Sequence, residues 1–189
     1  GEAWNGWIEF KGAPIFYYPW VDFPLDSSRK SGFLFPKIGM SNKNGFQWQQ
    51  PYYFNLAPNY DATLSPNYLS KRGLMLGGEF RYLQPDYSGV LRLEGLDDQL
   101  ENKTRSSVLF QHTQELAPNL NLDLNIQKTS DNEYLSDFGD RLSVTSQSNL
   151  PREGTLRYSG NEWSSFLRWQ RFQTLSTAAN PVEKPYDRA

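Results

Sequence analysis

Strict alternation of polar and aliphatic residues runs from Asn119 to Gln127, which reads N-L-N-L-D-L-N-I-Q. Because successive side chains of a β-strand point to opposite faces, this run predicts a strand with one aliphatic and one polar face. We place that strand at 119–129. Looser versions of the pattern, several rich in aromatic residues, predict further strands at 4–10, 13–23, 33–41, 45–56, 59–70, 73–83, 88–97, 105–114, 141–149, 154–159 and 163–175.

Two kinds of break separate these strands, and they alternate along the chain. One kind is short and contains proline, at 57–59, 84–86, 117–119 and 150–152. The other is polar and of variable length, at 71–73, 97–104, 130–140 and 159–162, with one helical turn expected within 132–138. An antiparallel meander places every second connection on the same edge, so the sequence predicts an all-β fold of up-and-down strands. Such asymmetric edges are typical of an outer-membrane β-barrel.

Hydropathy agrees with strands rather than helices as membrane-crossing elements. A helical span needs about 20 apolar residues, and no run in the sequence approaches that length. A transmembrane strand needs only about 10 residues with one apolar side, so a polar average is compatible with a barrel. Tyr and Trp cluster near the expected strand ends, which predicts an aromatic belt at headgroup level, although such rings also pack well on any sheet.

Charge and composition narrow the function. The net charge of −2 disfavours nucleic acid as a partner, and no nucleotide-binding or metal-ligand motif points to a cofactor. The chain has no cysteine and one histidine, His112, which we expect to be a polar residue facing the barrel interior rather than a catalytic base. The chain begins without Met or an export signal and stops in a Pro-containing coil, so we interpret it as an excised segment.

Several stretches resemble the LptD family, which assembles lipopolysaccharide at the surface of Gram-negative bacteria. The longest match is P-Y-Y-F-N-L-A-P-N-Y-D-A-T at 51–63, and it is highly specific. Shorter matches are G-A-P-I-F-Y at 12–17, R-K-S-G-F-L at 29–34, Y-L-S-K-R-G at 68–73 and E-F-R-Y-L at 79–83. The strong resemblance therefore covers residues 12–83, and a looser one continues toward the end of the chain.

The resemblance implies a particular division of the chain. Residues 1–25 would end a periplasmic β-jellyroll, 26–32 would form a junction, 33–175 would be the N-terminal strands of an incomplete outer-membrane barrel, and 176–189 would lead to the next strand. It also implies an LptE-type lipoprotein plug, a periplasmic Lpt bridge, lipopolysaccharide and outer-membrane lipid as partners. The expected location is the outer membrane, with the N-terminal part in the periplasm, and no enzyme activity or cofactor is implied.

Four residues are candidates for a role in transport. Pro36 and Pro51 match family prolines in the first two barrel strands, beside a lateral gate. Proline has no N–H to donate to a ladder, so two in neighbouring strands predict weak pairing there. The alternative is that either proline marks a bulge or strand end. Arg29 and Lys30, at the junction, are candidates for contact with lipopolysaccharide phosphate.

Other readings remain open at this level. A soluble secreted β-sandwich that binds glycans through exposed aromatic residues would also show alternating strands, but its aliphatic faces would pair in a dry core. An outer-membrane phospholipase would need a serine held by His112 and is disfavoured. Two charged groups are expected to be exposed. One is a hairpin tip formed by Lys71 and Arg72. The other is an acidic group, for which divalent-cation binding is the alternative, and it comprises Glu94, Asp97, Asp98 and Glu101.

Overall fold

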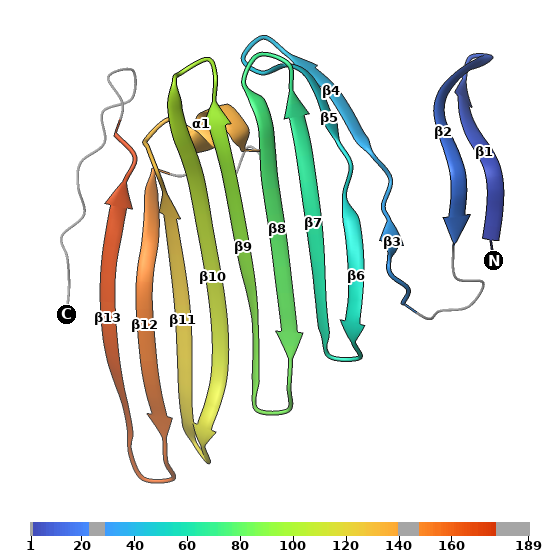
Figure 1. Cartoon of the computed structure of the whole chain (residues 1–189). Helices are drawn as coiled ribbons and strands as arrows, with labels where there is room; N and C mark the ends of the chain where they lie inside the picture. Colours follow the sequence, from blue (N-terminus) through green and yellow to red (C-terminus); the bar gives the residue numbers. More distant parts are fainter. Residues whose placement is uncertain (1, 23–28, 140–147, 177–189) are drawn as a thin grey trace.

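The computed structural model describes residues 2–22, 29–139 and 148–176, and they are almost entirely antiparallel β-structure (Figure 1). β1 (Glu2–Phe10) and β2 (Ala13–Asp22) form a separate two-stranded sheet. All other strands belong to one sheet of eleven. They are β3 (Gly32–Phe33), β4 (Lys37–Ser41), β5 (Gly45–Gln49), β6 (Tyr52–Ala57), β7 (Tyr60–Leu69), β8 (Gly73–Leu83), β9 (Tyr87–Asp98), β10 (Lys103–Ala117), β11 (Leu120–Thr129), β12 (Asn149–Ser159) and β13 (Ser164–Thr174). The predicted all-β fold class is confirmed.

From β7 onward the sheet is an up-and-down meander in which each strand pairs with the next. Short connections at 58–59, 84–86, 118–119 and 160–163 lie at one edge, which we call the turn edge (Figure 1). The connections at 42–44, 70–72 and 99–102 lie at the other, which we call the loop edge, together with residues 130–139 after β11. Asn119 closes one short turn with φ 70°, a left-handed conformation that asparagine tolerates better than most residues.

The fourth proline break was predicted wrongly. Residues 149–159 form one continuous strand, β12, and Pro151 lies inside it opposite Phe172. Proline is tolerated there because the pairing of β12 with β11 ends at Arg152, one residue away. The polar break at 159–162 consequently lies at the turn edge rather than the loop edge. The expected strand at 141–149 falls mostly outside the described residues, and β11 pairs directly with β12.

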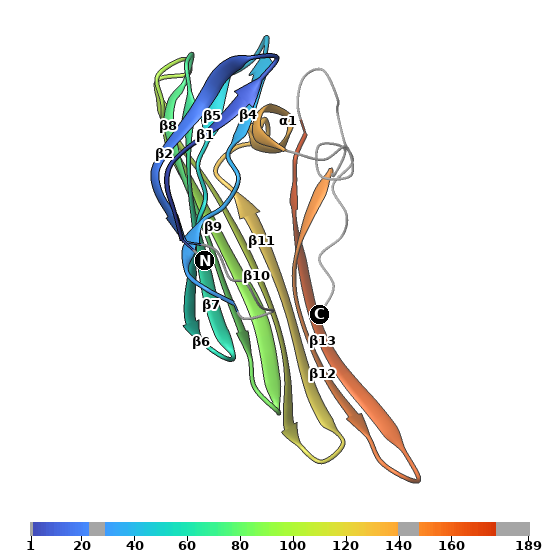
Figure 2. The same ribbon diagram turned by 90° about the vertical axis from the view of Figure 1, so that its right-hand side faces the viewer.

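One short helix, α1 (Tyr134–Phe138), lies where a helical turn was expected. Figure 2 shows the sheet bent, with α1 on its concave side near the loop edge. Its Tyr134 side chain forms a small core with Leu69, Met75 and Leu96, and Phe138 packs against that core. Among the described residues, no helix has the length and apolarity to cross a membrane.

Candidate functional site: a two-faced sheet with a broken edge

Cross-strand register sorts the side chains of the sheet into two chemically distinct faces. One row of partners across β8 to β11 is Phe80, Leu91, Phe110 and Ile126, and the neighbouring row is Arg81, Val90, Gln111 and Asn125. Paired residues in a sheet share a face, so the first row belongs to what we call the apolar face and the second to the polar face. The polar face is the concave side, because α1 packs on Met75 and Leu96, which share it.

No second layer covers the apolar face in the part of the chain that the structure describes. Leu120, Leu122, Leu124 and Ile126 are only half-buried, and large residues such as Leu76 and Leu167 are more than half exposed. The described residues include only six buried hydrophobic side chains. A β-sandwich would seal its aliphatic faces in a dry core, so these residues give that alternative no support.

Ion pairs lie on the polar face. Asp61 accepts from Arg81 (2.7 Å), Glu79 pairs with Arg92, and Glu153 pairs with Arg168 (2.7 Å) across β12 and β13. A surface that carries paired charges and carboxamides is suited to water and sugars rather than to acyl chains.

Aromatic rings form a belt on the apolar face near the turn edge. Tyr60 stacks on Phe80 (6.2 Å between centroids), Phe80 contacts Tyr82, and Tyr82 contacts both Tyr87 and His112. His112 was expected to face the interior, and this prediction was wrong. The register places it on the apolar face opposite Leu124, where Tyr82 supplies a polar partner with its hydroxyl oxygen 2.7 Å from Nδ1 of the ring.

The first two strands of the large sheet are each interrupted at a predicted proline. Pro36 lies in the break between β3 and β4, and Pro51 in the break between β5 and β6. β4 pairs with β5 over five positions, whereas β3 pairs with β6 over only two. Pro66 of β7 faces the same break, where its carbonyl oxygen accepts from the Gln50 N–H (3.0 Å). We call this stretch, from Leu34 to Pro66 across the three strands, the proline seam.

A glutamine side chain replaces one of the missing backbone donors in the proline seam. The Leu34 N–H donates to the Pro51 oxygen (2.9 Å), but the reciprocal bond is impossible because Pro51 has no N–H. Nε2 of Gln50 donates to the Leu34 oxygen instead, at 2.9 Å. The sequence did not indicate this role, although a carboxamide directly before a strand proline is a signal that could have suggested it.

An apolar hollow of about 460 Å³ opens over the proline seam on the apolar face. It is large enough to receive part of an acyl chain, and aromatic and aliphatic groups form most of its surface. The lining residues are Phe33, Trp48, Gln50, Tyr52, Phe54, Leu64, Pro66, Tyr68 and Leu74.

The junction residues are tied to the sheet beside the turn edge. Arg29 forms an ion pair with Asp61 (2.9 Å) and donates to the Pro58 oxygen. Asn55 binds the same segment by donating its side-chain amide to the Arg29 oxygen (2.8 Å). The Arg29 side chain remains 47% exposed, so its guanidinium is accessible to a further anion. Lys30 is exposed beside it.

Two arginines at the loop edge are buried, which the sequence reading missed. Arg105 is fully buried and pairs with Asp131 (2.6 Å) and Asp137 (2.8 Å), while Arg72 pairs with Asp98 (2.6 Å). The prediction of an exposed tip at Arg72 was therefore wrong, because Asp98 of β9 and Asp137 of α1 both pair with its guanidinium. Asp98 was also expected to be solvated and is buried instead.

The loop helix adds an aromatic cover to this cluster. Phe138 places its ring 4.8 Å from the Arg105 guanidinium, and the Tyr134 hydroxyl donates to Glu94 (2.9 Å). Burial, followed by the nearby Glu94 carboxylate, raises the pKa of Tyr134. Glu94 accepts this bond while remaining exposed, as Asp97 and Glu101 do, so of the four acidic residues expected to be exposed only Asp98 is buried. No cluster that could hold a metal ion occurs among the described residues.

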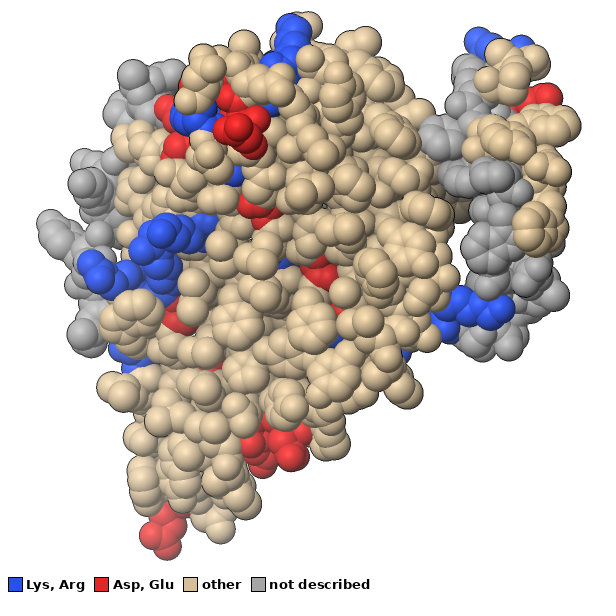
Figure 3. Space-filling model, viewed as in Figure 1, with Lys and Arg blue, Asp and Glu red and all other residues tan. Residues whose placement is uncertain are grey.

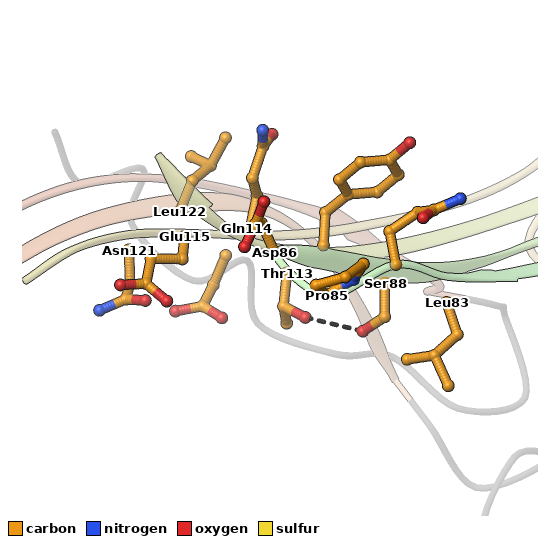
Figure 4. Close-up of a pocket in the computed structure, with 12 residues that line it drawn as sticks. Leu83, Pro85, Asp86, Ser88, Thr113, Gln114, Glu115, Asn121 and Leu122 are labelled. Atoms are coloured by element: carbon orange, nitrogen blue, oxygen red, sulfur yellow. Dashed lines mark hydrogen bonds between the residues drawn. The ribbon is translucent and has the colours of Figure 1, made fainter. Parts of the chain in front are cut away.

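A second hollow, of about 270 Å³, lies at the turn edge between the β8–β9 and β10–β11 connections (Figure 4). Ser88 and Thr113 share a hydrogen bond of 3.1 Å there, and Asp86 and Glu115 lie beside them. His112 is not among the residues that line it. The hollow therefore presents hydroxyls and carboxylates without the histidine that a serine nucleophile would need.

Comparison with known proteins gives a consistent result along the chain. The family model described as "LptD: LPS transport system D" matches residues 103–189. The LPS-assembly protein LptD of Aromatoleum aromaticum is 46% identical over 190 residues, covering 100% of this chain and 24% of the relative. The corresponding protein of Azoarcus sp. is 47% identical over 191 residues, with 100% and 23% covered.

A third relative gives a similar match. The LPS-assembly protein LptD of Chromobacterium violaceum is 44% identical over 191 residues, covering 98% of this chain and 24% of the relative. The chain thus spans about a quarter of the length of the curated relatives it matches. Given a matching family model and relatives of this identity along its length, the chain belongs to the LptD family.

Proposed function

We propose that this chain forms part of an outer-membrane translocon that delivers lipopolysaccharide to the outer leaflet through a barrel lumen and a lateral gate. The relatives are named for lipopolysaccharide assembly, and the two-faced sheet matches a barrel wall with lipid outside and water inside. The observation that carries the gate is the proline seam, where two adjacent strands are both interrupted.

The chain would divide as the family resemblance implies. Residues 1–25 would close a periplasmic jellyroll, 26–32 would be the junction, 33–175 would be the first barrel strands, and 176–189 would continue to the next strand. The separate β1–β2 sheet and the larger sheet that begins at β3 support this division. The location would then be the outer membrane, with the N-terminal part in the periplasm.

In the proposed mechanism the substrate divides between the two faces. Acyl chains leave through the lateral gate beside the proline seam, where Pro36 and Pro51 weaken pairing and the apolar hollow receives them. The sugar moves along the polar face. Arg29 and Lys30 would meet the lipid phosphates at the junction, with Asp61 holding the Arg29 guanidinium in place.

The proposed partners are an LptE-type lipoprotein plug in the lumen and the periplasmic Lpt bridge at the jellyroll. Copurification of the full-length protein from outer-membrane fractions with the LptE-type lipoprotein tests this assembly. A full-length protein that is recovered as a soluble monomer would exclude the proposal.

Restoring the missing donors tests the gate itself. Pro36→Ala with Pro51→Ala in the full-length protein should strengthen the proline seam, since each restored backbone bond contributes about 0.5–1.5 kcal/mol. We expect roughly a two- to tenfold fall in the open population per bond, measured as slower appearance of newly made lipopolysaccharide at the cell surface.

The matched control is Pro151→Ala, which changes a strand proline far from the seam. It should leave surface delivery unchanged. Equal delivery by wild type, control and the double variant, with all three present in the outer membrane, would contradict the gate at this seam.

A further inference from the structure

A connected series of ion pairs crosses the polar face from the junction to β9. Arg29 and Arg81 both bind Asp61, whose Oδ2 atom accepts from Nη1 of Arg29 (2.9 Å) and Nη2 of Arg81 (2.9 Å). The series continues through Glu79, whose carboxylate lies 3.5 Å from Nε of Arg81 and accepts from Nε of Arg92. Three cations therefore share two carboxylates, and one positive charge is left over. We call the three arginines of this series the arginine path.

Exposure places the positive charge of the series at the surface and the negative charge beneath it. The side chains of Arg29, Arg81 and Arg92 are 47%, 53% and 57% exposed, whereas those of Asp61 and Glu79 are 6% and 27% exposed. The ladder pairs Asp61 with Arg81 and Glu79 with Arg92, so these residues share the polar face. Figure 3 views the sheet from the other, apolar side, where the surface over the middle strands is mainly tan. A molecule that approaches the polar face here would meet guanidinium groups first.

The arginines keep N–H groups that the ion pairs do not use. Arg81 binds Asp61 through Nε (2.7 Å) and Nη2 (2.9 Å), which leaves Nη1 for another acceptor. Arg92 binds Glu79 through Nε, which leaves both of its terminal nitrogens. Because the carboxylates already hold these guanidinium groups, less side-chain entropy is lost when an anion binds.

Another ion pair on the polar face lacks this surplus of positive charge. Arg168 of β13 is 48% exposed and pairs one to one with Glu153 of β12 (2.7 Å). It therefore offers a comparison in which the exposure is similar but the charge is balanced. At the end of the arginine path nearer α1, the next acidic residue on this face of β9 is Glu94, which is bound by the hydroxyls of Ser107 and Tyr134.

We propose that Arg29, Arg81 and Arg92 bind the phosphate groups of a phosphorylated sugar in succession as it moves along the polar face from the junction. Guanidinium groups match phosphate oxygens in charge and geometry. Contacts at half-exposed side chains are weakened by water and counter-ions, so a phosphate can pass from one to the next. Asp61 and Glu79 are positioning residues. The inference deepens the proposed function and rests on it, since the sugar would be the polar part of lipopolysaccharide.

Photocrosslinking tests the arginine path. Val90 is the ladder partner of Arg81 and lies two residues from Arg92, so Val90→benzoylphenylalanine places a photoreactive group beside both arginines. The full-length protein with this label is irradiated in the presence of lipopolysaccharide, either intact or chemically dephosphorylated, and adducts are quantified by immunoblotting. We expect about three- to tenfold more adduct with the intact form, the effect of a charge-assisted bond partly exposed to water.

Arg81→Gln with Arg92→Gln in the labelled protein should abolish this preference for the intact form. Because Arg81 also holds the buried Asp61, Arg92→Gln alone is a second variant, which leaves Asp61 paired and should still reduce the preference. Arg168→Gln is the matched control, because it removes a similarly exposed guanidinium from the same face but from the balanced pair with Glu153. It should keep the wild-type preference.

An unchanged preference in both variants, an equal loss in the control, or equal adducts from intact and dephosphorylated lipopolysaccharide would each overturn the arginine path. Depletion of the full-length protein from cells tests the proposed function separately, because it should stop surface delivery of lipopolysaccharide. If delivery stops on depletion but Val90 gives no phosphate-dependent adduct, the path alone is refuted. If delivery continues, the proposed function fails and the path with it.

Discussion

Gln50 connects the interrupted strands at the start of the large sheet. Its backbone N–H donates to Pro66 of β7, while its side chain donates to Leu34 beside β3. One residue therefore connects three strands at the place where two prolines have removed donors. Its side chain also lines the hollow over the proline seam, so an entering acyl chain would contact the group that closes it.

Gln50→Leu should loosen the proline seam without changing its shape greatly. The Leu34 oxygen would lose its side-chain donor, and a neutral hydrogen bond contributes about 0.5–1.5 kcal/mol. Exchange of the Leu34 amide hydrogen, followed by mass spectrometry on the full-length protein, should become roughly two- to tenfold faster.

Gln49→Leu is the control, since the neighbouring glutamine lies in β5 with its side chain on the other face of the sheet. It should leave the exchange rate of the Leu34 amide unchanged. If Gln50→Leu also leaves that rate unchanged, the side-chain bond does not strengthen the seam.

Residue roles were predictable from the sequence only where the chemistry is local. A proline lacks its N–H in any context, so Pro36 and Pro51 could be identified as breaks before any coordinates. The burial of Arg72 could not be foreseen, because its partner Asp98 is 26 residues away and its cover comes from α1. His112 was predicted on the wrong face because we judged from the polarity of its side chain, whereas the face is set by its position in the alternation of β10.

Among the elements, the loop with α1 is held to the sheet mainly by charge. Arg105 bridges Asp131 and Asp137, so three charged groups from β10 and the loop meet out of water. Partial burial would by itself raise the pKa of Asp131. The hydrogen bonds from Arg105 and Ser130 outweigh burial and hold that pKa below its usual range.

The attachment of this loop should consequently weaken in acid. A carboxylate with a lowered pKa in the folded state contributes stability above its unfolded pKa, near 3.9, and that stability is lost as pH falls through the folded value. We expect the loop to detach below about pH 4, seen as a fall in the anisotropy of a fluorophore at Ser136→Cys.

Asp131→Asn serves as the comparison in the same labelled background. It should show weaker attachment at neutral pH and a smaller change on acidification, because one titrating group has been removed. An unchanged acid transition in this variant would show that Asp131 is not the group responsible.

Strand prediction succeeded where alternation and proline agreed and failed where they disagreed. The turns around Pro58, Pro85 and Pro118 are as expected. Pro151 was taken for a fourth turn but lies inside β12. Beyond the end of the β11–β12 pairing, the side chain of Gln173 binds the backbone of Thr129 instead. Long-range pairing of this kind leaves no local signal in the sequence.

For the whole molecule, the separation of the two faces is the property that makes a membrane position testable. Nitroxide labels placed singly from Leu122 to Ile126 of the full-length protein in vesicles should alternate in accessibility. Labels at 122, 124 and 126 should collide with oxygen dissolved in lipid, and those at 123 and 125 with a water-soluble nickel complex. A run without this period of two, or with all positions exposed to the nickel complex, would contradict a barrel wall.

Because the first strands of the large sheet are interrupted, their pairing is divided into two separate stretches. Two short stretches of strand pairing flank the proline seam: β4–β5 with five paired positions and β3–β6 with two. In the proposed opening, the two-position β3–β6 pairing would separate while the five-position β4–β5 pairing keeps the strands aligned. Opening would then break only the shorter stretch of pairing, and the stretch that stays paired would return the strands to the same register.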